Sequence, residues 1–546
     1  MKIEISDFGA QPDTGADTSP AANLAGQALA RSGGGTLRFA PGVYHFQPKE
    51  AFEQTCWVSN HDSGVRRIGM PLIGLDHLTI EAEGAVFIFH GRMIPVWLSD
   101  CRNVRWTGGE IRWAEPMHFE AEVTASDRTH GEFSLIGPGE FVVRERQGYL
   151  RGDGWEDELH DLLFYDPTSR RIVPGTEDHF CNGYFGGRLQ FEDLGQGRFR
   201  INRETPWPAI PPVGSRMVLQ ANVRDCPGMV IDRCTDVRID DLVIRHCINV
   251  GVLAQNSADL TLQRVEIAPD PSSDRLVSSG NDATHFVGCS GLVALHDCRF
   301  QGMLDDATNV HGHYARIQEQ PEPNQVLVRH MHGQQRGFQL AAPGEQVAWV
   351  DPATFAHRQI LTVTAFTRVD AEQALITFDA PWDTGTPDGL IENLSGNRAR
   401  GMLVATRGSV RITNNHIAAP GAGIAIIPDC NYWFESSPTR NVLIEGNTFD
   451  QCLSSPGWGD AAIFVQTELK AAPPDGFLHG TIRIEDNTFR IADPRVVQAH
   501  SVSELSISGN RLEPVPGLAD AMNSRSQGPF NIRDCGEVEL SDNALI

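Results

Sequence analysis

The chain has 546 residues and a formal net charge of −25, with 70 Asp and Glu against 45 Lys and Arg. This balance argues against nucleic acid and anionic membrane surfaces as partners, because both are bound through basic patches. Lysine occurs only at Lys2, Lys49 and Lys470, so a lysine nucleophile or Schiff base is not expected. The 53 glycines and 33 prolines favour a turn-rich, all-β protein.

The sequence shows no targeting or membrane segment. No apolar run approaches the roughly 20 residues of a membrane helix, so membrane insertion is not expected. Residues 1–7 lack the apolar stretch of a signal peptide, which leaves a cytoplasmic protein and a mature secreted or periplasmic form both open. The 11 cysteines include no Cys-x-x-Cys pair. We interpret those in strand-like repeats as small buried apolar residues rather than as disulfides or zinc ligands.

The N-terminal part is predicted to form a cap. An Ala-rich helix is expected over about 20–32, and the glycines at 33–35 lead into the first strands. A helix in front of the first strands can cover the open end of a stack of strands and prevent edge-to-edge aggregation. This opening resembles that of pectin-lyase-like β-helix proteins.

A short pattern recurs along the rest of the chain. Each copy has two apolar residues in alternation, a turn and a second short apolar run, and copies return every 23 to 40 residues. Alternation at this spacing predicts stacked coils of a parallel β-helix. The copies begin at Val104, Val237, Leu260, Val293, Val410, Val442, Ile482, Leu505 and Val538.

The repeat spacing jumps twice, which indicates inserted modules. The intervals from Val104 to Val237 and from Val293 to Val410 are 133 and 117 residues long. Each holds alternating apolar runs and predicts a small, barrel-like antiparallel β module. We therefore expect a cap with the first coils at 1–113, a module at 114–224, central coils at 225–312, a second module at 313–395 and C-terminal coils at 396–546.

The late coils carry asparagine at one repeated turn position. Stacked asparagine side chains can hydrogen-bond to one another along a ladder, so we interpret them as structural. They are Asn415, Asn447, Asn487, Asn510 and Asn543.

The most informative motif is a repeat of Asp-Ala-Thr. It occurs at Asp282 and again at Asp306, and Asp305 precedes the second copy. The offset of 24 residues is about one coil, and residues one coil apart lie roughly 4.8 Å from each other. The sequence thus predicts three carboxylates in one patch. Clustered carboxylates push one another's pKa values apart, which provides an acid and a base in the same site.

Other polar residues are expected around this patch. Coil alignment adds Asn249, Arg398 and Arg400, while the Asp-Ala-Thr copies lead on to His285, Asn309 and His311. His285, His311 and His313 invite a metal interpretation, but their spacing is short and substrate binding or packing is preferred. Trp433 and Glu435 would suit a sugar, whose apolar face stacks on the indole while the acid binds hydroxyls. No Gly-x-Ser-x-Gly elbow, phosphate loop or dinucleotide fingerprint is present.

Several stretches resemble glycoside hydrolase family 110. They are residues 302–312, 282–286, 397–403 and 433–436, and the likeness extends over most of the chain. The resemblance implies a right-handed parallel β-helix with two β-barrel insertions, a site without metal or cofactor, and an exo-acting α-1,3-galactosidase that inverts the anomeric carbon. The expected substrates are glycans with terminal galactose, of blood-group-B type or linear Galα1,3Gal.

The family's catalytic aspartates correspond to Asp282, Asp305 and Asp306. Our hypothesis makes Asp305 the general acid and gives Asp282 and Asp306 the attacking water as shared base, in the arrangement that inversion requires. The residues assigned to substrate binding are Asn249, His285, Asn309, His311, Arg398, Arg400, Trp433 and Glu435. Neither a monomer nor a homodimer is excluded.

Two other functions compete with this one. The first is another polysaccharide hydrolase or lyase on a β-helix, although a lyase acting on polyuronate would favour calcium and a basic groove. The second is a glycan-binding β-helix without enzymatic activity, against which the three-acid cluster speaks. The fold alone does not decide between them.

Overall fold

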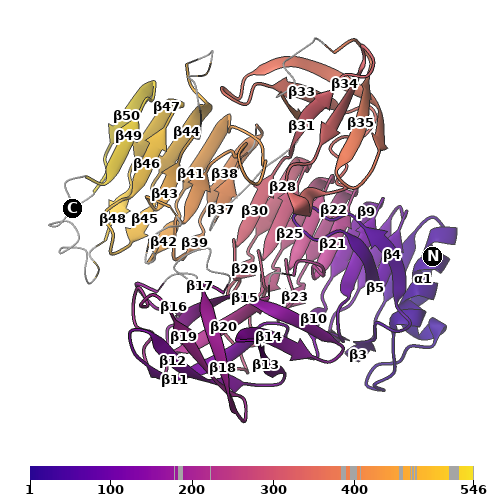
Figure 1. Ribbon diagram of the computed structural model, residues 1–546. Helices are drawn as coiled ribbons and strands as arrows, with labels where there is room; N and C mark the ends of the chain where they lie inside the picture. The colour runs from indigo at the N-terminus through magenta and orange to yellow at the C-terminus, as the bar shows by residue number, and fades with distance from the viewer. Residues whose placement is uncertain are drawn as a thin grey trace.

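The computed structural model describes residues 1–176, 179–181, 188–221, 223–382, 389–393, 402–405, 407–453, 459–467, 469, 473, 476–513, 515 and 528–544. These residues form a right-handed parallel β-helix. Figure 1 shows two further β modules, one above and one below the middle of the helix in this view. The predicted fold class is therefore confirmed.

One long sheet follows the β-helix from end to end and connects all of its coils. Its strands pair in parallel, apart from the antiparallel hairpin of the first two. In the described residues the order is β4 (Phe52–Cys56), β5 (Gly64–Ile73), β8 (Ile94–Ser99), β21 (Met229–Asp232), β24 (Val252–Gln255), β27 (Thr284–Val287), β30 (Thr308–His311), β37 (Met402–Val404), β40 (Ile424–Ile426), β43 (Ile463–Val465), β46 (Val497–His500) and β49 (Phe530–Arg533).

The second face of the β-helix is built from two consecutive parallel sheets. The first contains β1 (Lys2–Glu4), β2 (Gly35–Arg38), β6 (Leu78–Glu81), β9 (Arg102–Thr107), β22 (Thr235–Asp240), β25 (Ala258–Gln263) and β28 (Ser290–His296). The second contains β38 (Ser409–Thr413), β41 (Asn441–Glu445), β44 (His479–Glu485), β47 (Val502–Ser508) and β50 (Glu537–Ser541).

The third face is likewise divided into two sheets of very short strands. The first holds β3 (Gly42–Phe46), β7 (Ala85–Phe89), β10 (Glu110–Trp113), β23 (Val243–Ile244), β26 (Glu266–Ile267) and β29 (Arg299–Phe300). The second holds β39 (His416–Ile417), β42 (Thr448–Asp450), β45 (Thr488–Arg490) and β48 (Arg511–Leu512).

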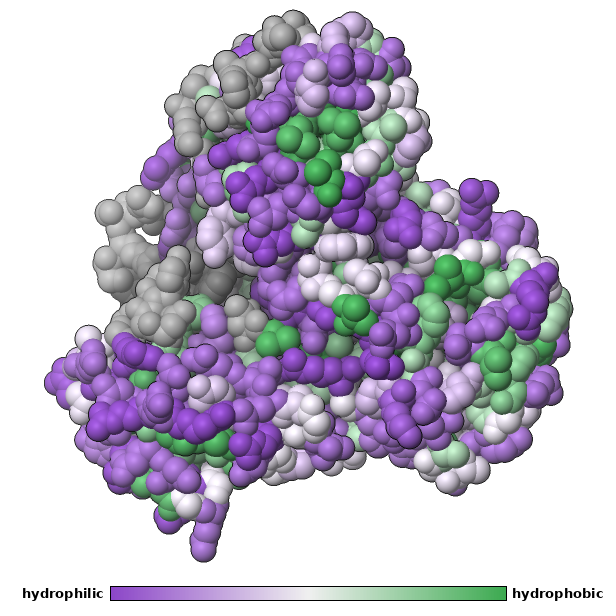
Figure 2. Space-filling view, turned by 45° about the vertical axis from the view of Figure 1, so that its right-hand side comes forward, coloured by the Kyte–Doolittle hydropathy of each residue, from purple (hydrophilic) through white to green (hydrophobic). Residues whose placement is uncertain are grey.

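The core of the β-helix consists of apolar side chains that stack from coil to coil. Phe286, Leu262 and Ile267 are fully buried in it, and the rings of Phe449 and Phe489 stack with centroids 4.7 Å apart. Helix α1 (Ser19–Arg31), which follows the short η1 (Ile5–Phe8), packs against β5 at the N-terminal end. The outer surface is different, since Figure 2 shows a mostly hydrophilic face with small, separate hydrophobic patches.

The first inserted module is an antiparallel sheet that curls on itself. Its two ends approach each other, because Phe141 and Phe191 lie in ring contact at 5.6 Å. The strands are β11 (Phe119–Ser126), β12 (His130–Ile136), β13 (Glu140–Arg144), β14 (Gln147–Gly152), β15 (Trp155–Asp166), β16 (Arg171–Ile172), β17 (His179–Phe180), β18 (Leu189–Gly195), β19 (Arg198–Arg203) and β20 (Arg216–Ala221).

The second inserted module is a closed barrel. Its strands are β31 (Tyr314–Glu319), β32 (Gln325–Arg329), β33 (Gln346–Val350), β34 (His357–Arg368), β35 (Gln373–Phe378) and β36 (Leu390–Asn393), with the short η2 (Gly333–Gln335) between the second and third. No helix in the described part of the chain is long and apolar enough to cross a membrane.

The predicted asparagine ladder is present in the C-terminal coils. Asn447 Nδ2 donates to Asn487 Oδ1 at 2.9 Å, and Asn487 Nδ2 donates to Asn510 Oδ1 at 2.9 Å. The same amides also bind backbone groups, for example Asn487 Nδ2 to the Ile444 carbonyl at 2.9 Å. Each side chain thereby satisfies buried polar groups of its own coil and of a neighbouring coil.

Replacing the central rung, Asn487→Ala, is expected to lower the free energy of unfolding by about 3 kcal/mol, because buried donors and acceptors in two coils lose their partner. Denaturant unfolding would measure the change. The control is Asn441→Ala, since exposed Asn441 reaches Ser409 only at 3.4 Å, and its expected change is under about 0.5 kcal/mol. Equal, small changes in both variants would show that the ladder does not stabilise the fold.

Candidate active site

The three aspartates lie just before two adjacent strands of the long sheet. Asp282 precedes β27, and Asp305 and Asp306 precede β30. The strands pair with Thr284 opposite Thr308, and Ala283 N donates to Asp306 O at 3.0 Å. This register confirms that the 24-residue offset corresponds to one coil.

The three carboxylates form one compact cluster. One oxygen atom of each lies within 4.8 Å of the others. Asp306 N donates to Asp282 Oδ1 at 3.0 Å, so the backbone of one coil orients the acid of the next. The side chain of Asp282 is 4% exposed and that of Asp305 is 35% exposed. Asp305 and Asp306 can both reach the cluster because they lie in an irregular segment before β30, where neighbouring residues need not face opposite ways.

Such a cluster could in principle hold a cation, but acidic groups are often found together without one. We assign no metal to it. The expectation of a metal-free site remains a prediction, which chelation with EDTA would test.

Behind Asp282 lies a pair of buried histidines. His285 Nδ1 is 2.6 Å from Asp282 Oδ2, and His285 Nε2 is 2.8 Å from His311 Nε2. His311 Nδ1 in turn lies 2.5 Å from the Gly312 carbonyl oxygen. The two rings are 2% and 0% exposed, so they support the cluster from the protein side.

Glu435 extends this buried chain. Its Oε1 lies 3.5 Å from His311 Nε2 and accepts a hydrogen bond from Asn60 Nδ2 at 3.0 Å. The segment that carries Glu435 runs beside the residues after β30, because Gly312 N donates to Ser436 O at 2.8 Å. Glu435 is 1% exposed, and its carboxylate faces the histidine pair.

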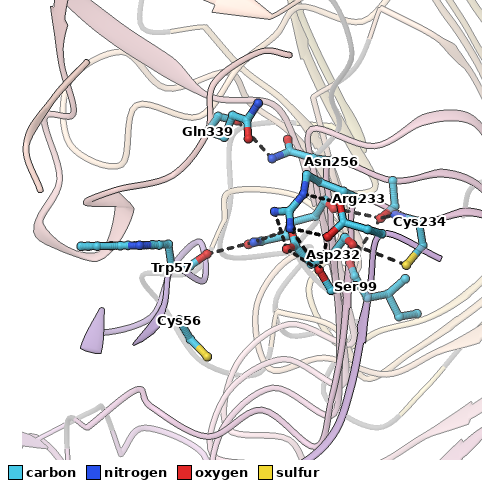
Figure 3. A network of polar contacts seen from close by, with 12 residues as sticks. Cys56, Trp57, Ser99, Asp232, Arg233, Cys234, Asn256 and Gln339 are labelled. Carbon is cyan, nitrogen blue, oxygen red and sulfur yellow. Dashed lines mark hydrogen bonds and ion pairs between the residues drawn. The ribbon is translucent and has the colours of Figure 1, made fainter. Parts of the chain in front are cut away.

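The loop between β4 and β5 covers this face of the long sheet. Gln255 binds it with both amide atoms, since Oε1 accepts from Ser59 N and Nε2 donates to Trp57 O, each at 2.9 Å. Gln255 Nε2 also donates to Asp232 Oδ1 at 3.0 Å, within the polar network shown in Figure 3. Burial raises the pKa of Asp232 to about 6, although Arg233 opposes this rise.

The exposed side of the cluster is bordered by Arg224 and Trp433. Arg224 NH2 lies 3.5 Å from Asp305 Oδ2, and its guanidinium carbon is 5.7 Å from the centroid of the Trp433 ring. The second module contributes here, because the His332 ring lies 4.1 Å from that of Trp433 and Gln335 Nε2 donates to Trp433 O at 2.6 Å.

The first module packs against the loop that leads to Asp282. Glu120 Oε1 accepts from Leu276 N at 2.9 Å, and Gln220 Nε2 donates to Gly280 O at 2.5 Å. Both modules therefore contact segments that carry site residues, one beside Asp282 and the other beside Trp433.

The structure places the predicted binding residues at different depths. Asn249 is buried. Its Oδ1 accepts hydrogen bonds from the backbone N–H groups of Asp225 and Cys226, each at 2.8 Å, and its Nδ2 donates to the Val223 carbonyl at 2.7 Å. It therefore holds the segment of Arg224 in place. Asn309, in register with His285, is also buried. Arg398 and Arg400 lie outside the described residues.

Three neighbours of the site were not predicted from the sequence. Asn60 and His61 come from the β4–β5 loop, and Arg224 precedes β21. Burial lowers the pKa of His61 to about 3, with Arg224 and His285 among the further causes. None of the three occupies a repeated position, so the spacing of the coils gives no signal for them.

Two family models match the inserted modules. GLAA-B beta-barrel domain I matches residues 119–217, and GLAA-B beta-barrel domain II matches residues 325–389. These ranges fall within the two modules of the structure.

Relatives are found over nearly the whole chain. An alpha-1,3-galactosidase A of Bacteroides fragilis is 30% identical, with 95% of this chain and 88% of the relative covered. The chain belongs to glycoside hydrolase family 110. An alpha-1,3-galactosidase B of Bacteroides thetaiotaomicron is 29% identical over 100% of this chain and 91% of its own length. The matches to this glycoside hydrolase extend through both inserted modules, because they cover 95% and 100% of its chain.

Solved structures resemble the family 110 chain only distantly. The A-module of a mannuronan C-5 epimerase from Azotobacter vinelandii has a TM-score of 0.41 at 12% identity, and covers 100% of this chain and 99% of its own. An exopolygalacturonase from Thermotoga maritima has a TM-score of 0.36 at 12% identity, with 99% and 92% covered.

Proposed function

We propose that the protein is an exo-acting α-1,3-galactosidase that removes terminal α-1,3-linked galactose from glycans and inverts the anomeric carbon. The observation that carries the proposal is the compact cluster of Asp282, Asp305 and Asp306 in a family 110 chain. Two relatives that match it over most of their own length are named alpha-1,3-galactosidases, which supports the linkage and the sugar. The proposed substrates are glycans of blood-group-B type and linear Galα1,3Gal.

In this mechanism Asp305 is the general acid. It is the most exposed of the three acids, so it can reach the glycosidic oxygen of the leaving group. Two carboxylates within 4.8 Å favour its protonated form, whereas Arg224 at 3.5 Å opposes it.

Asp282 and Asp306 act as the base. They are buried beneath Asp305, and the Asp306 amide holds Asp282 in a fixed orientation. Water placed between their oxygens would lose its proton to the pair while its oxygen bonds to the anomeric carbon. The aglycone leaves as the Asp305 proton passes to the glycosidic oxygen.

The spacing of the acids favours a second candidate for the stereochemistry. Inverting glycosidases usually have carboxyl groups about 6.5–9.5 Å apart, and retaining ones about 5–5.5 Å apart. The oxygen separation of 4.8 Å or less is closer to the retaining value. Inversion is supported instead by the family resemblance, since a pair of carboxylates serves either course. The anomer of the first product distinguishes the two courses.

Trp433 is proposed to bind the sugar. The ring is partly exposed, and Arg224 links it to Asp305. An indole at this distance could stack on the apolar face of galactose while Asp305 reaches the glycosidic oxygen. The histidines and Glu435 are too deeply buried for the direct substrate contact predicted from the sequence, and they are given another role below.

Release of galactose from Galα1,3Gal and from the blood-group-B trisaccharide tests the function. We expect hydrolysis of at least one substrate, with its rate unchanged by EDTA, because three carboxylates can provide both proton transfers. Loss of activity on chelation, restored by a divalent cation, would contradict the metal-free mechanism. Binding of both sugars without galactose release would favour a glycan-binding protein, and product from another linkage would favour a different β-helix hydrolase.

A further inference from the structure

The histidine pair behind Asp282 holds more protons than two neutral rings supply. Three contacts of 2.5 to 2.8 Å follow one another, from Asp282 to His285, from His285 to His311 and from His311 to the Gly312 carbonyl. Each contact needs one hydrogen between the two atoms, because two acceptors do not approach so closely. Two neutral imidazoles carry only two such hydrogens. The series of hydrogen bonds from Asp282 to Gly312 therefore contains a third hydrogen.

The surroundings favour a positive charge on the rings. Carboxylates lie on both sides of the pair, Asp282 at 2.6 Å from His285 and Glu435 at 3.5 Å from His311. The other nearby imidazoles are neutral, since burial lowers the pKa of His61 to about 3 and that of His313 well below its usual value. Among the described residues, the titratable groups around the pair are Asp282, Glu435, His61 and His313, with Asp305, Asp306, His332 and Arg224 beyond them.

We propose that His285 and His311 share the third proton as a buried cation that keeps Asp282 ionised and oriented, with Glu435 as the second counter-charge. This inference rests on the proposed function, in which Asp282 belongs to the base. His285, His311 and Glu435 are then positioning residues, because they act through Asp282 and do not touch the reacting atoms.

The cation determines which aspartate of the cluster holds the exchangeable proton. Three carboxylates in close contact would otherwise hold a proton between them without preference, and a protonated Asp282 could not accept one from water. A positive charge within hydrogen-bonding distance favours the ionised form of a carboxylate. The exchangeable proton is thereby directed to Asp305, on the exposed side. During turnover the proton of water passes to Asp282 or Asp306, the Asp305 proton passes to the leaving oxygen, and the histidine pair neither gains nor loses one.

The proton count can be read in the resting protein, without any substrate. Ring ¹⁵N NMR at pH 8 is expected to show one doubly protonated imidazole, assigned by its disappearance in His285→Asn and in His311→Asn. The Glu435→Gln variant should lose this signal at a lower pH, because the cation then lacks a counter-charge. Singly protonated rings throughout in the wild-type protein at pH 8 would place the third proton on Asp282 and overturn the proposal.

A second measurement uses the pH profile of kcat/KM. In His285→Asn the amide still donates to Asp282 but carries no charge, so the acid limb is expected to move upward by about 1–3 pH units. The control His330→Gln breaks another buried histidine pair, His313 Nε2 to His330 Nδ1 at 3.0 Å, and should leave the limb in place. Lower activity in His285→Asn with an unmoved limb would assign the histidine a merely structural role.

The two proposals can fail separately. If the wild-type protein releases no galactose, the proposed function fails while the NMR experiment still reports the proton count. If galactose is released but the rings are neutral, the cation and the role of Asp282 in the base are refuted, while the galactosidase activity stands.

Discussion

The Asp305→Asn variant is expected to hydrolyse Galα1,3Gal with kcat/KM about 10²–10⁴-fold below the wild type, the usual range for loss of general acid catalysis. An aryl α-galactoside with a good leaving group, such as 4-nitrophenol, should lose far less, because the departing phenolate needs little protonation. Steady-state rates on both substrates would measure the difference. The isosteric amide still fills the space beside Arg224, so the fold should be preserved.

Asp534→Asn is a suitable control for Asp305→Asn, since Asp534 lies in the last coil with its side chain 82% exposed. Its rates on both substrates should equal those of the wild type. An equal loss on the natural and the aryl substrate in Asp305→Asn would remove Asp305 from the role of proton donor.

In the Asp282→Asn variant both substrates should lose activity by about 10²–10⁴-fold whatever the leaving group, because the shared base that deprotonates water loses one of its two carboxylates. The variant is expected to fold. Its amide can donate to His285 Nδ1, after which His285 Nε2–H donates to His311 and His311 Nδ1–H to Gly312. Every contact of the buried chain is then still satisfied, but by two neutral rings.

Azide provides the readout for Asp282→Asn, since it attacks without a base. Added azide should restore turnover and yield β-galactosyl azide. It should not do so in Asp305→Asn on the natural substrate. Failure of azide to rescue Asp282→Asn, together with dependence on the leaving group, would show that Asp282 is the proton donor instead.

The repeat allowed much of this site to be predicted from the sequence. Coil spacing decides which residues are neighbours along the β-helix, so the stacking of Asp282 and Asp306 and the ladder through Asn447, Asn487 and Asn510 followed from it. The same spacing located the two insertions, because they interrupt it.

Spacing does not reveal what covers each face of a coil. His285, His311 and Glu435 were therefore predicted to bind substrate, whereas the β4–β5 loop and the segment around Ser436 bury them. The same limit explains why Asn60 and Arg224 were missed. They come from loops far away in sequence, and only the folded chain brings them to the cluster.

The most direct test of the central claim is proton NMR of the first galactose released by the wild-type protein from Galα1,3Gal. The proposed mechanism, with Asp305 as acid and the Asp282–Asp306 pair as base, predicts β-galactose first, followed by slow mutarotation to the α form. α-Galactose as the first product would contradict it and assign one of the three aspartates as a nucleophile. The absence of galactose from both Galα1,3Gal and the blood-group-B trisaccharide, under conditions where the sugars bind, would contradict the enzymatic function itself.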